Sequence, residues 1–237
     1  LQQPLLGLVV LIAAALVARF EIGTGSEVAL NPATLLVPAL LAVWILDMMR
    51  RGEVRLAPSR TNRPFLLFLA AGLLSLVIGI ATWDPAVPRS STFLIVQLAQ
   101  WAIFAFSGGA FWLMANLVQD VDWLRRITFS FLALAGGLAL LRVTPGSGVL
   151  LSRVATHAVN LALFWMLLTA LAGGQLLFNR QLPWGWQAFL GASLAAVAVY
   201  VFSLGQETAS NWVGVLAVAG ILAWLRWPRL RWPVILL

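Results

Sequence analysis

The chain has 237 residues, of which 62% are hydrophobic and 10% charged, and its mean hydropathy is +0.95. Soluble domains carry about 25% charged residues, so this composition excludes an ordinary soluble protein and predicts a multi-pass membrane protein. The net charge of +7 comes from arginine alone; with no cysteine and one histidine, the chain is expected to bind no metal or other cofactor.

In chain order, short polar loops alternate with apolar runs of roughly 17–25 residues, the length that crosses a bilayer as a helix. We expect membrane spans at 4–20, 29–49, 64–82, 93–118, 127–143, 154–174, 186–204 and 211–225. The sequence thus predicts an all-α, polytopic transmembrane helix bundle of about eight spans, forming one domain over 1–237. Because the residues after 231 are apolar again, we expect the chain to be the N-terminal part of a longer protein.

Arginines mark the loops on one side of this arrangement. Eleven fall on one side and four on the other: Arg50, Arg51, Arg55, Arg60, Arg63, Arg125, Arg126, Arg180, Arg226, Arg229 and Arg231 against Arg19, Arg89, Arg142 and Arg153. Positive residues favour cytoplasmic loops, so the first side and both chain ends are predicted to be cytoplasmic. Arginines in short loops indicate topology signals and anionic lipid partners, not nucleic acid. Arginine in place of lysine suggests a GC-rich bacterial genome.

The most unusual stretch is 141–160, where a Pro-Gly-Ser-Gly break separates Arg142 from Arg153. The one histidine, His157, and Asn160 follow the break. If the chain after Arg153 is helical, Arg153, His157 and Asn160 fall within an arc of about 60°. Burying an ionisable group within a membrane span costs free energy unless the group is paired or binds a ligand, so we predict a functional site here.

Arginine offers a fork of donors that matches phosphate oxygens, so we expect this site to bind a diphosphate-bearing lipid or another anionic substrate. The alternatives are that the arginines reach the outer head groups, or that one of them pairs with Glu207. His157 is either a general base or, as lone histidines more often are, a hydrogen-bonded packing residue. No catalytic residue is assigned. The candidate substrate-binding residues are Arg89, Arg142, Arg153, His157, Asn160 and Glu207, with Gln206 beside them.

Polar side chains also follow one face of the run 93–118. Gln97, Gln100 and Ser107 share this face, and Asn116 lies further along. Amides inside membrane helices usually bond between helices, which we expect here; lining of a substrate groove is the alternative. The pair Gly108-Gly109 predicts close approach of a neighbouring helix.

Four stretches resemble the N-terminal half of the O-antigen ligase and O-antigen polymerase superfamily of bacterial envelope proteins. They are PLLGLVVLIAAALVARF at 4–20 with NPATLLVPALLAVWIL at 31–46, DWLRR at 122–126, the segment from Arg153 to Asn160-Leu-Ala, and TASNWVGVLAVAG at 208–220. The last is similar to a Ser-Arg-x-x-Trp/Leu-x-Gly entry into a later span, except that Asn211 replaces the arginine.

The resemblance implies a multi-pass glycosyltransferase of the bacterial inner membrane. It would move a glycan from undecaprenyl diphosphate to an acceptor hydroxyl on the periplasmic face, without a metal. The resemblance also implies that Arg153 and Arg142 contact the diphosphate and offset its charge. The family's large periplasmic loop, with its catalytic histidine, is expected beyond Leu237, and His157 is not equivalent to that histidine.

Two other classes of function stay open at this point. One is a non-catalytic integral subunit of a larger membrane complex, since twelve tryptophans and thirteen phenylalanines offer surface for packing. The other is a transporter, although the two halves of the chain show no convincing repeat.

Overall fold

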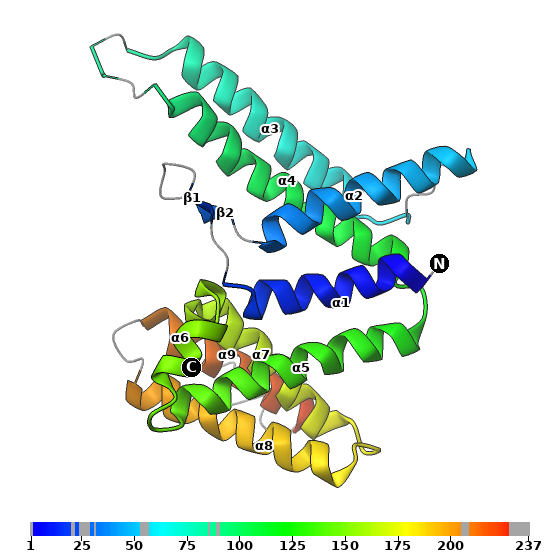
Figure 1. The fold of residues 1–237 in the computed structure, drawn as a ribbon, viewed down its shortest axis with the longest axis vertical. Coiled ribbons are helices and arrows are strands. Elements are labelled where there is room, and N and C mark those ends of the chain that lie inside the picture. The colour runs from blue at the N-terminus through cyan, green and yellow to red at the C-terminus, as the bar shows by residue number, and fades with distance from the viewer. Residues whose placement is uncertain are drawn as a thin grey trace. The chain divides into compact units, whose positions relative to one another are not determined.

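The computed structural model describes residues 2–19, 22–23, 29–30, 32–52, 57–84, 86–88, 91–204 and 209–227, and these ranges are almost entirely helical (Figure 1). In chain order the elements are α1 (Gln2–Val17), β1 (Ile22–Gly23), β2 (Ala29–Leu30), α2 (Pro32–Arg51), α3 (Asn62–Ala81), α4 (Phe93–Leu117), α5 (Val121–Val143), α6 (Gly148–Val154), η1 (His157–Asn160), α7 (Ala162–Phe178), α8 (Trp184–Val199), η2 (Tyr200–Leu204) and α9 (Ala209–Arg226). The strands β1 and β2 form one two-residue antiparallel pair.

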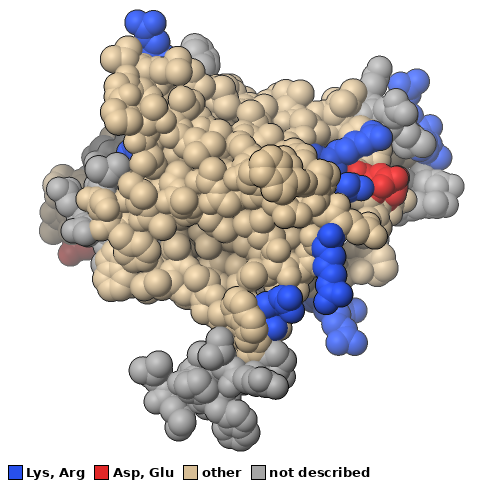
Figure 2. Space-filling view, turned by 90° about the horizontal axis from the view of Figure 1, so that it is seen from below, with Lys and Arg blue, Asp and Glu red and all other residues tan. Residues whose placement is uncertain are grey.

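Five of the described helices are long and apolar enough to cross a membrane: Pro32–Arg51, Asn62–Ala81, Phe93–Leu117, Val121–Val143 and Trp184–Ser203. Their outer surfaces are apolar as well. None of the residues of α3 is buried, and Leu67 on this helix is 70% exposed. Figure 2 shows that most of the face in view carries no charged side chain. Such extensive apolar exposure suits lipid, not water.

Three further apolar helices are shorter: Leu5–Val17, Ala162–Phe178 and Trp212–Arg226. The 17 residues of α7 make a helix about 26 Å long, slightly less than the ~30 Å hydrocarbon core of a bilayer. Each of the eight predicted runs therefore contains a helix. The number of helices that cross the membrane, and the cytoplasmic position of both chain ends, stay predictions.

Two predicted boundaries are wrong. The expected span 154–174 begins too early, because α7 starts only at Ala162. The expected span 127–143 begins too late, because α5 starts at Val121 and includes the polar DWLRR stretch. The Asp120 carboxylate accepts a hydrogen bond of 3.1 Å from the Asp122 N–H, and Asp122 lies in the first turn, where negative charge is favoured. Polar residues therefore begin this helix, where composition alone indicated a loop.

The chain divides into two compact units, the first made of Leu1–Leu11 with Phe20–Leu124 and the second of Ile12–Arg19 with Arg125–Leu237. The prediction of a single domain over the whole chain stays a prediction. In the first unit α4 packs against α2 and α3 (Figure 1). The close approach predicted at the glycine pair is confirmed, since a Cβ at Gly109 would overlap Leu41 of α2, and one at Gly108 would overlap the ring of Phe65 of α3.

The second unit is built around α7, which packs against α8 and α9. Its core contains side chains with no exposed surface, among them Leu132 of α5, Trp165 and Leu168 of α7 and Leu190 of α8. Gly136 allows α5 and α8 to approach closely, because a Cβ there would lie only 2.6 Å from the Ser193 hydroxyl. This core supports the break between α5 and α7, where the sequence predicts the functional site.

Candidate functional site

The break between α5 and α7 consists of three short pieces. Gly146 has a φ of +81°, which glycine adopts without strain, and it lies in the turn from α5 into α6. The backbone is extended at Ala155 and Thr156, and the single 3-10 turn η1 follows. The continuous helix expected after Arg153 is therefore wrong. Arg153 ends α6, whereas His157 and Asn160 are the first and last residues of η1, so they share no helix face.

Thr156 is the physical reason for this interruption. Its backbone N–H donates to the Leu16 carbonyl at 3.1 Å, and its hydroxyl donates to the Ala15 carbonyl at 2.6 Å. Both carbonyls belong to the last turn of α1, where an α-helix leaves them without an internal partner. Thr156 is only 7% exposed. Because the backbone is extended at Thr156, this one residue bonds both carbonyls at the end of α1.

We expect Thr156→Val to destabilise the protein by about 1–2 kcal/mol, because the Ala15 carbonyl loses its partner in a buried setting. Thermal unfolding in detergent should show a lower Tm, and hydrogen exchange should be faster in the last turn of α1. Thr156→Ser keeps the hydroxyl and serves as the control, with a Tm close to wild type. Equal Tm values for the valine variant and the wild type would contradict this role.

Four of the six candidate residues lie in the described part of the chain. Arg153, His157 and Asn160 are exposed, whereas Arg142 is half-buried. Within the described ranges, no hydrogen bond or ion pair joins these four residues to one another. Arg89, Gln206 and Glu207 lie outside the described residues, so an arginine pairing with Glu207 stays a prediction.

Arg142, in the last turn of α5, is held by an aromatic partner. Its Cζ lies 5.0 Å from the centroid of the Tyr200 ring, and its Nη2 donates to the Tyr200 hydroxyl at 3.3 Å. The Tyr200 ring in turn stacks on Trp165, with centroids 4.4 Å apart and planes at 26°. A cation over an aromatic face is attracted by the ring quadrupole. The stack therefore fixes the position of the guanidinium group.

Two features of this stack are unusual for packing alone. Tyr200 opens η2, a π-helical segment, and such segments occur frequently at functional sites. The Trp165 side chain is fully buried, yet its Nε1–H has no hydrogen-bond partner among the described residues. An unsatisfied buried donor costs about 1–3 kcal/mol, so a polar group or water is expected to reach it.

Sequence reasoning identified Arg142 but missed Tyr200 and Trp165. Tyr200 is the only tyrosine of the chain, and a phenolic hydroxyl in an apolar run is a signal that should have drawn attention. Trp165 offered no comparable signal, because it is one of twelve tryptophans. Only the packing of α7 against η2 distinguishes it from the others.

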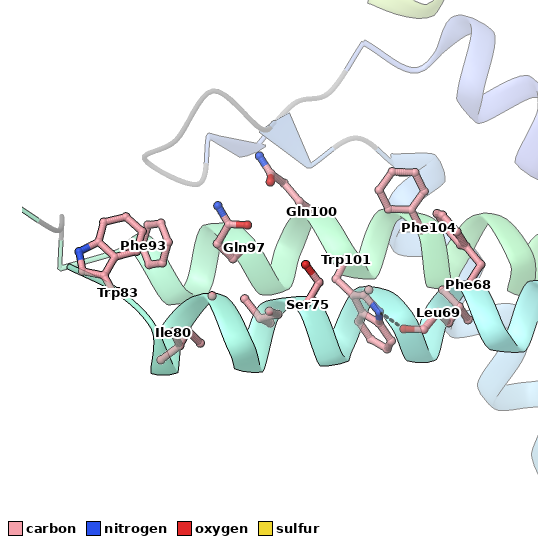
Figure 3. A pocket seen from close by; sticks show the side chains of 13 residues that line it. Phe68, Leu69, Ser75, Ile80, Trp83, Phe93, Gln97, Gln100, Trp101 and Phe104 are labelled. Carbon is pink, nitrogen blue, oxygen red and sulfur yellow. Dashed lines mark hydrogen bonds between the residues drawn. The ribbon is translucent and has the colours of Figure 1, made fainter. Parts of the chain in front are cut away.

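A separate cavity of about 410 Å³ lies between α3 and α4 in the first unit (Figure 3). Its lining includes aromatic rings and three polar side chains: Phe68, Trp83, Phe93, Trp101, Phe104, Ser75, Gln97 and Gln100. None of the described lining residues is charged, so this lining suits an apolar or neutral polar group.

Of the four polar side chains predicted to bond between helices, Asn116 bonds to the Ala57 N–H just before α3, but the other three do not bond as expected. In the described part of the chain, neither the Gln97 nor the Gln100 side chain forms a hydrogen bond. The Ser107 hydroxyl donates to the Ile103 carbonyl of its own helix at 2.8 Å. Beside this cavity, α3 is joined to α4 by the Trp101 indole N–H, which donates to the Leu69 carbonyl at 3.0 Å (Figure 3). The interhelical bonds predicted for these three side chains are therefore not observed.

The long apolar helices are those of a helical membrane protein. At the end of one candidate span, α5, Tyr200 holds the Arg142 guanidinium group in place. Within the described residues, no three His, Asp or Glu side chains are grouped so that they could hold a metal ion. Comparison of the chain with protein-family models, with curated proteins and with solved structures finds no match.

Proposed function

We propose that this membrane protein binds the diphosphate group of a lipid-linked glycan through Arg142, and that it takes part in transfer of the glycan to an acceptor hydroxyl. The observation that carries the proposal is the half-buried Arg142 guanidinium, held over Tyr200. The transfer step rests on the resemblance to O-antigen ligases and polymerases, and the binding step rests on the geometry of Arg142.

The hydrogen-bonding capacity of Arg142 supports binding of an anion. A guanidinium group has five N–H donors, and the Tyr200 hydroxyl accepts from one of its nitrogens. No carboxylate among the described residues forms an ion pair with Arg142. As far as the described residues go, most donors of this positionally fixed cation thus remain for a ligand. Phosphate oxygens match this fork bidentately.

The remaining candidates surround the same break in the chain. Arg153, exposed in the last turn of α6, is proposed as the second cation for the diphosphate. His157 and Asn160, exposed in η1, are proposed to contact the same ligand. In glycan transfer the acceptor hydroxyl oxygen bonds to the sugar and gives up its proton to water. The bond between the sugar and the diphosphate breaks, and undecaprenyl diphosphate leaves with the bonding electrons and one added negative charge. Guanidinium groups favour this step by stabilising that charge.

A binding measurement on the purified chain tests the proposal. Undecaprenyl diphosphate and undecaprenol carry the same tail, so their affinities compare the diphosphate with a hydroxyl. We expect at least tenfold tighter binding of the diphosphate, which corresponds to about 1.4 kcal/mol or more. Equal affinities would contradict the proposal and favour a non-catalytic subunit, which has no reason to distinguish the two lipids.

A further inference from the structure

A second positively charged site lies in the first unit, where the chain enters α3. Amide side chains bond both backbone groups of Ala57, just before this helix. The Ala57 N–H donates to the Asn116 side-chain oxygen at 2.7 Å, and the Ala57 carbonyl accepts from the Asn62 side chain at 3.1 Å. Asn116 lies near the end of α4 and Asn62 is the first residue of α3. The segment 57–63 is therefore attached to both helices.

The two amides are themselves held in place. The Trp112 indole N–H donates to the Asn62 side-chain oxygen at 3.1 Å, and the Asn116 side-chain amide donates to the Trp112 carbonyl at 2.8 Å. Ser59 closes the turn, since its hydroxyl and carbonyl both accept from backbone N–H groups, of Thr61 and Asn62 respectively. This network gives the entry to α3 a defined conformation, unlike that of a flexible loop.

The conformation presents two arginines beside a recess of about 600 Å³. The recess is lined by Pro58, Ser59, Arg60, Asn62 and Arg63. Arg60 and Arg63 are exposed, and no described carboxylate forms an ion pair with either. The described lining thus carries two positive charges and no negative one, which is complementary to an anionic group.

The position of the recess along the helices identifies the kind of anion. Both α3 and α4 are long and apolar enough to cross a membrane, and the network joins the first residue of α3 to the last turns of α4. The recess therefore lies at the end of this helix pair, at the level of the lipid phosphates. Arginine counts predict this side as cytoplasmic, where anionic lipids are enriched.

From these observations we propose that Arg60 and Arg63 bind the phosphate head group of an anionic phospholipid. The guanidinium forks match phosphate oxygens, and the Ser59 and Asn62 side chains line the same recess. The site lies in the first unit and does not depend on Arg142 or on the proposed glycan carrier.

Native mass spectrometry of the full chain, extracted with phosphatidylglycerol or phosphatidylcholine, counts the lipids that remain bound. We expect wild type to retain phosphatidylglycerol preferentially, and Arg60→Ala/Arg63→Ala to weaken its binding about tenfold or more. Arg180→Ala/Arg226→Ala removes the same charge from two other exposed arginines and should change binding less than twofold. An equal loss in both double variants, or no loss in the first, would overturn the proposal.

Two further measurements extend this test. One asks whether the position of the arginines matters as well as their charge, and the other asks whether the ligand is a lipid or free phosphate. Asn116→Ala keeps both arginines but releases Ala57, so we expect a partial loss of phosphatidylglycerol with no change in net charge. Wild-type retention by this variant would show that the network does not position the site. Free inorganic phosphate should not displace the bound lipid, because it lacks acyl chains that contact the exposed apolar surface of α3. Displacement at equal concentration would indicate a site for soluble phosphate instead.

Discussion

Arg142→Ala is expected to lower the affinity for undecaprenyl diphosphate at least tenfold and to leave the affinity for undecaprenol unchanged. Hydrogen bonds to a charged partner contribute about 1.5–3 kcal/mol each, and about 1.4 kcal/mol corresponds to a factor of ten. Loss of even one such bond therefore accounts for the expected change. The measurement is a titration of the purified variant with each lipid.

Three variants show whether the effect belongs to the guanidinium fork. Arg142→Lys keeps the charge but not the planar fork, so an intermediate affinity is expected. Tyr200→Phe keeps the ring beneath the guanidinium and removes the hydroxyl acceptor, and a smaller loss is expected. Arg180→Ala removes an exposed arginine between α7 and α8 and serves as the charge control. If Arg142→Ala and Arg180→Ala bind the diphosphate equally well while both remain folded, Arg142 is not its ligand.

Gly108→Ala is expected to lower the Tm by roughly 4–10 °C, which corresponds to about 1–3 kcal/mol of overpacking in a chain of this size. A Cβ at this position would overlap the Phe65 ring of α3. The ring cannot move freely, because it packs edge-on against Trp112 of α4 at a centroid distance of 5.6 Å. Either the ring contact or the close packing of α3 on α4 must be given up. Thermal unfolding in detergent measures the change.

Gly79→Ala is the matched control in the same helix pair. Nothing lies within 4 Å of a Cβ built at Gly79, so the Tm should stay the same or rise, since alanine favours a helix by up to about 1 kcal/mol over glycine. Adding Phe65→Leu to Gly108→Ala frees space at the contact and should recover part of the lost Tm. If the Gly108→Ala and Gly79→Ala proteins have the same Tm, the close packing at Gly108 does not contribute to stability.

Local sequence properties were sufficient to predict the helices. An apolar run of membrane length forms a helix because every backbone hydrogen bond is then satisfied within the segment, whatever its neighbours are. Each of the runs in the sequence accordingly contains a helix. The glycine pair at 108–109 was likewise readable, because two adjacent residues without side chains mark a helix face that a neighbour can approach.

The candidate site could be predicted only in part. The break after α5 and the position of Arg142 followed from proline, glycine and charge along the chain. The helix expected after Arg153 was wrong, because Thr156 bonds to the end of α1 and not to its own helix. The Tyr200 partner of Arg142 was missed, because it lies 58 positions further along the chain and no local pattern near Arg142 indicates that the two are in contact.

The sequence by itself thus determined the class of fold, the presence of a helix in each apolar run and the presence of a cationic break. The tertiary structure alone decided where that break meets α1, which aromatic ring holds Arg142, and how Asn116 reaches Ala57. The physical reason is the range of the interactions. Helix formation in an apolar run depends on neighbouring residues, whereas these hydrogen bonds join residues 141, 58 and 59 positions apart and exist only once the helices have packed.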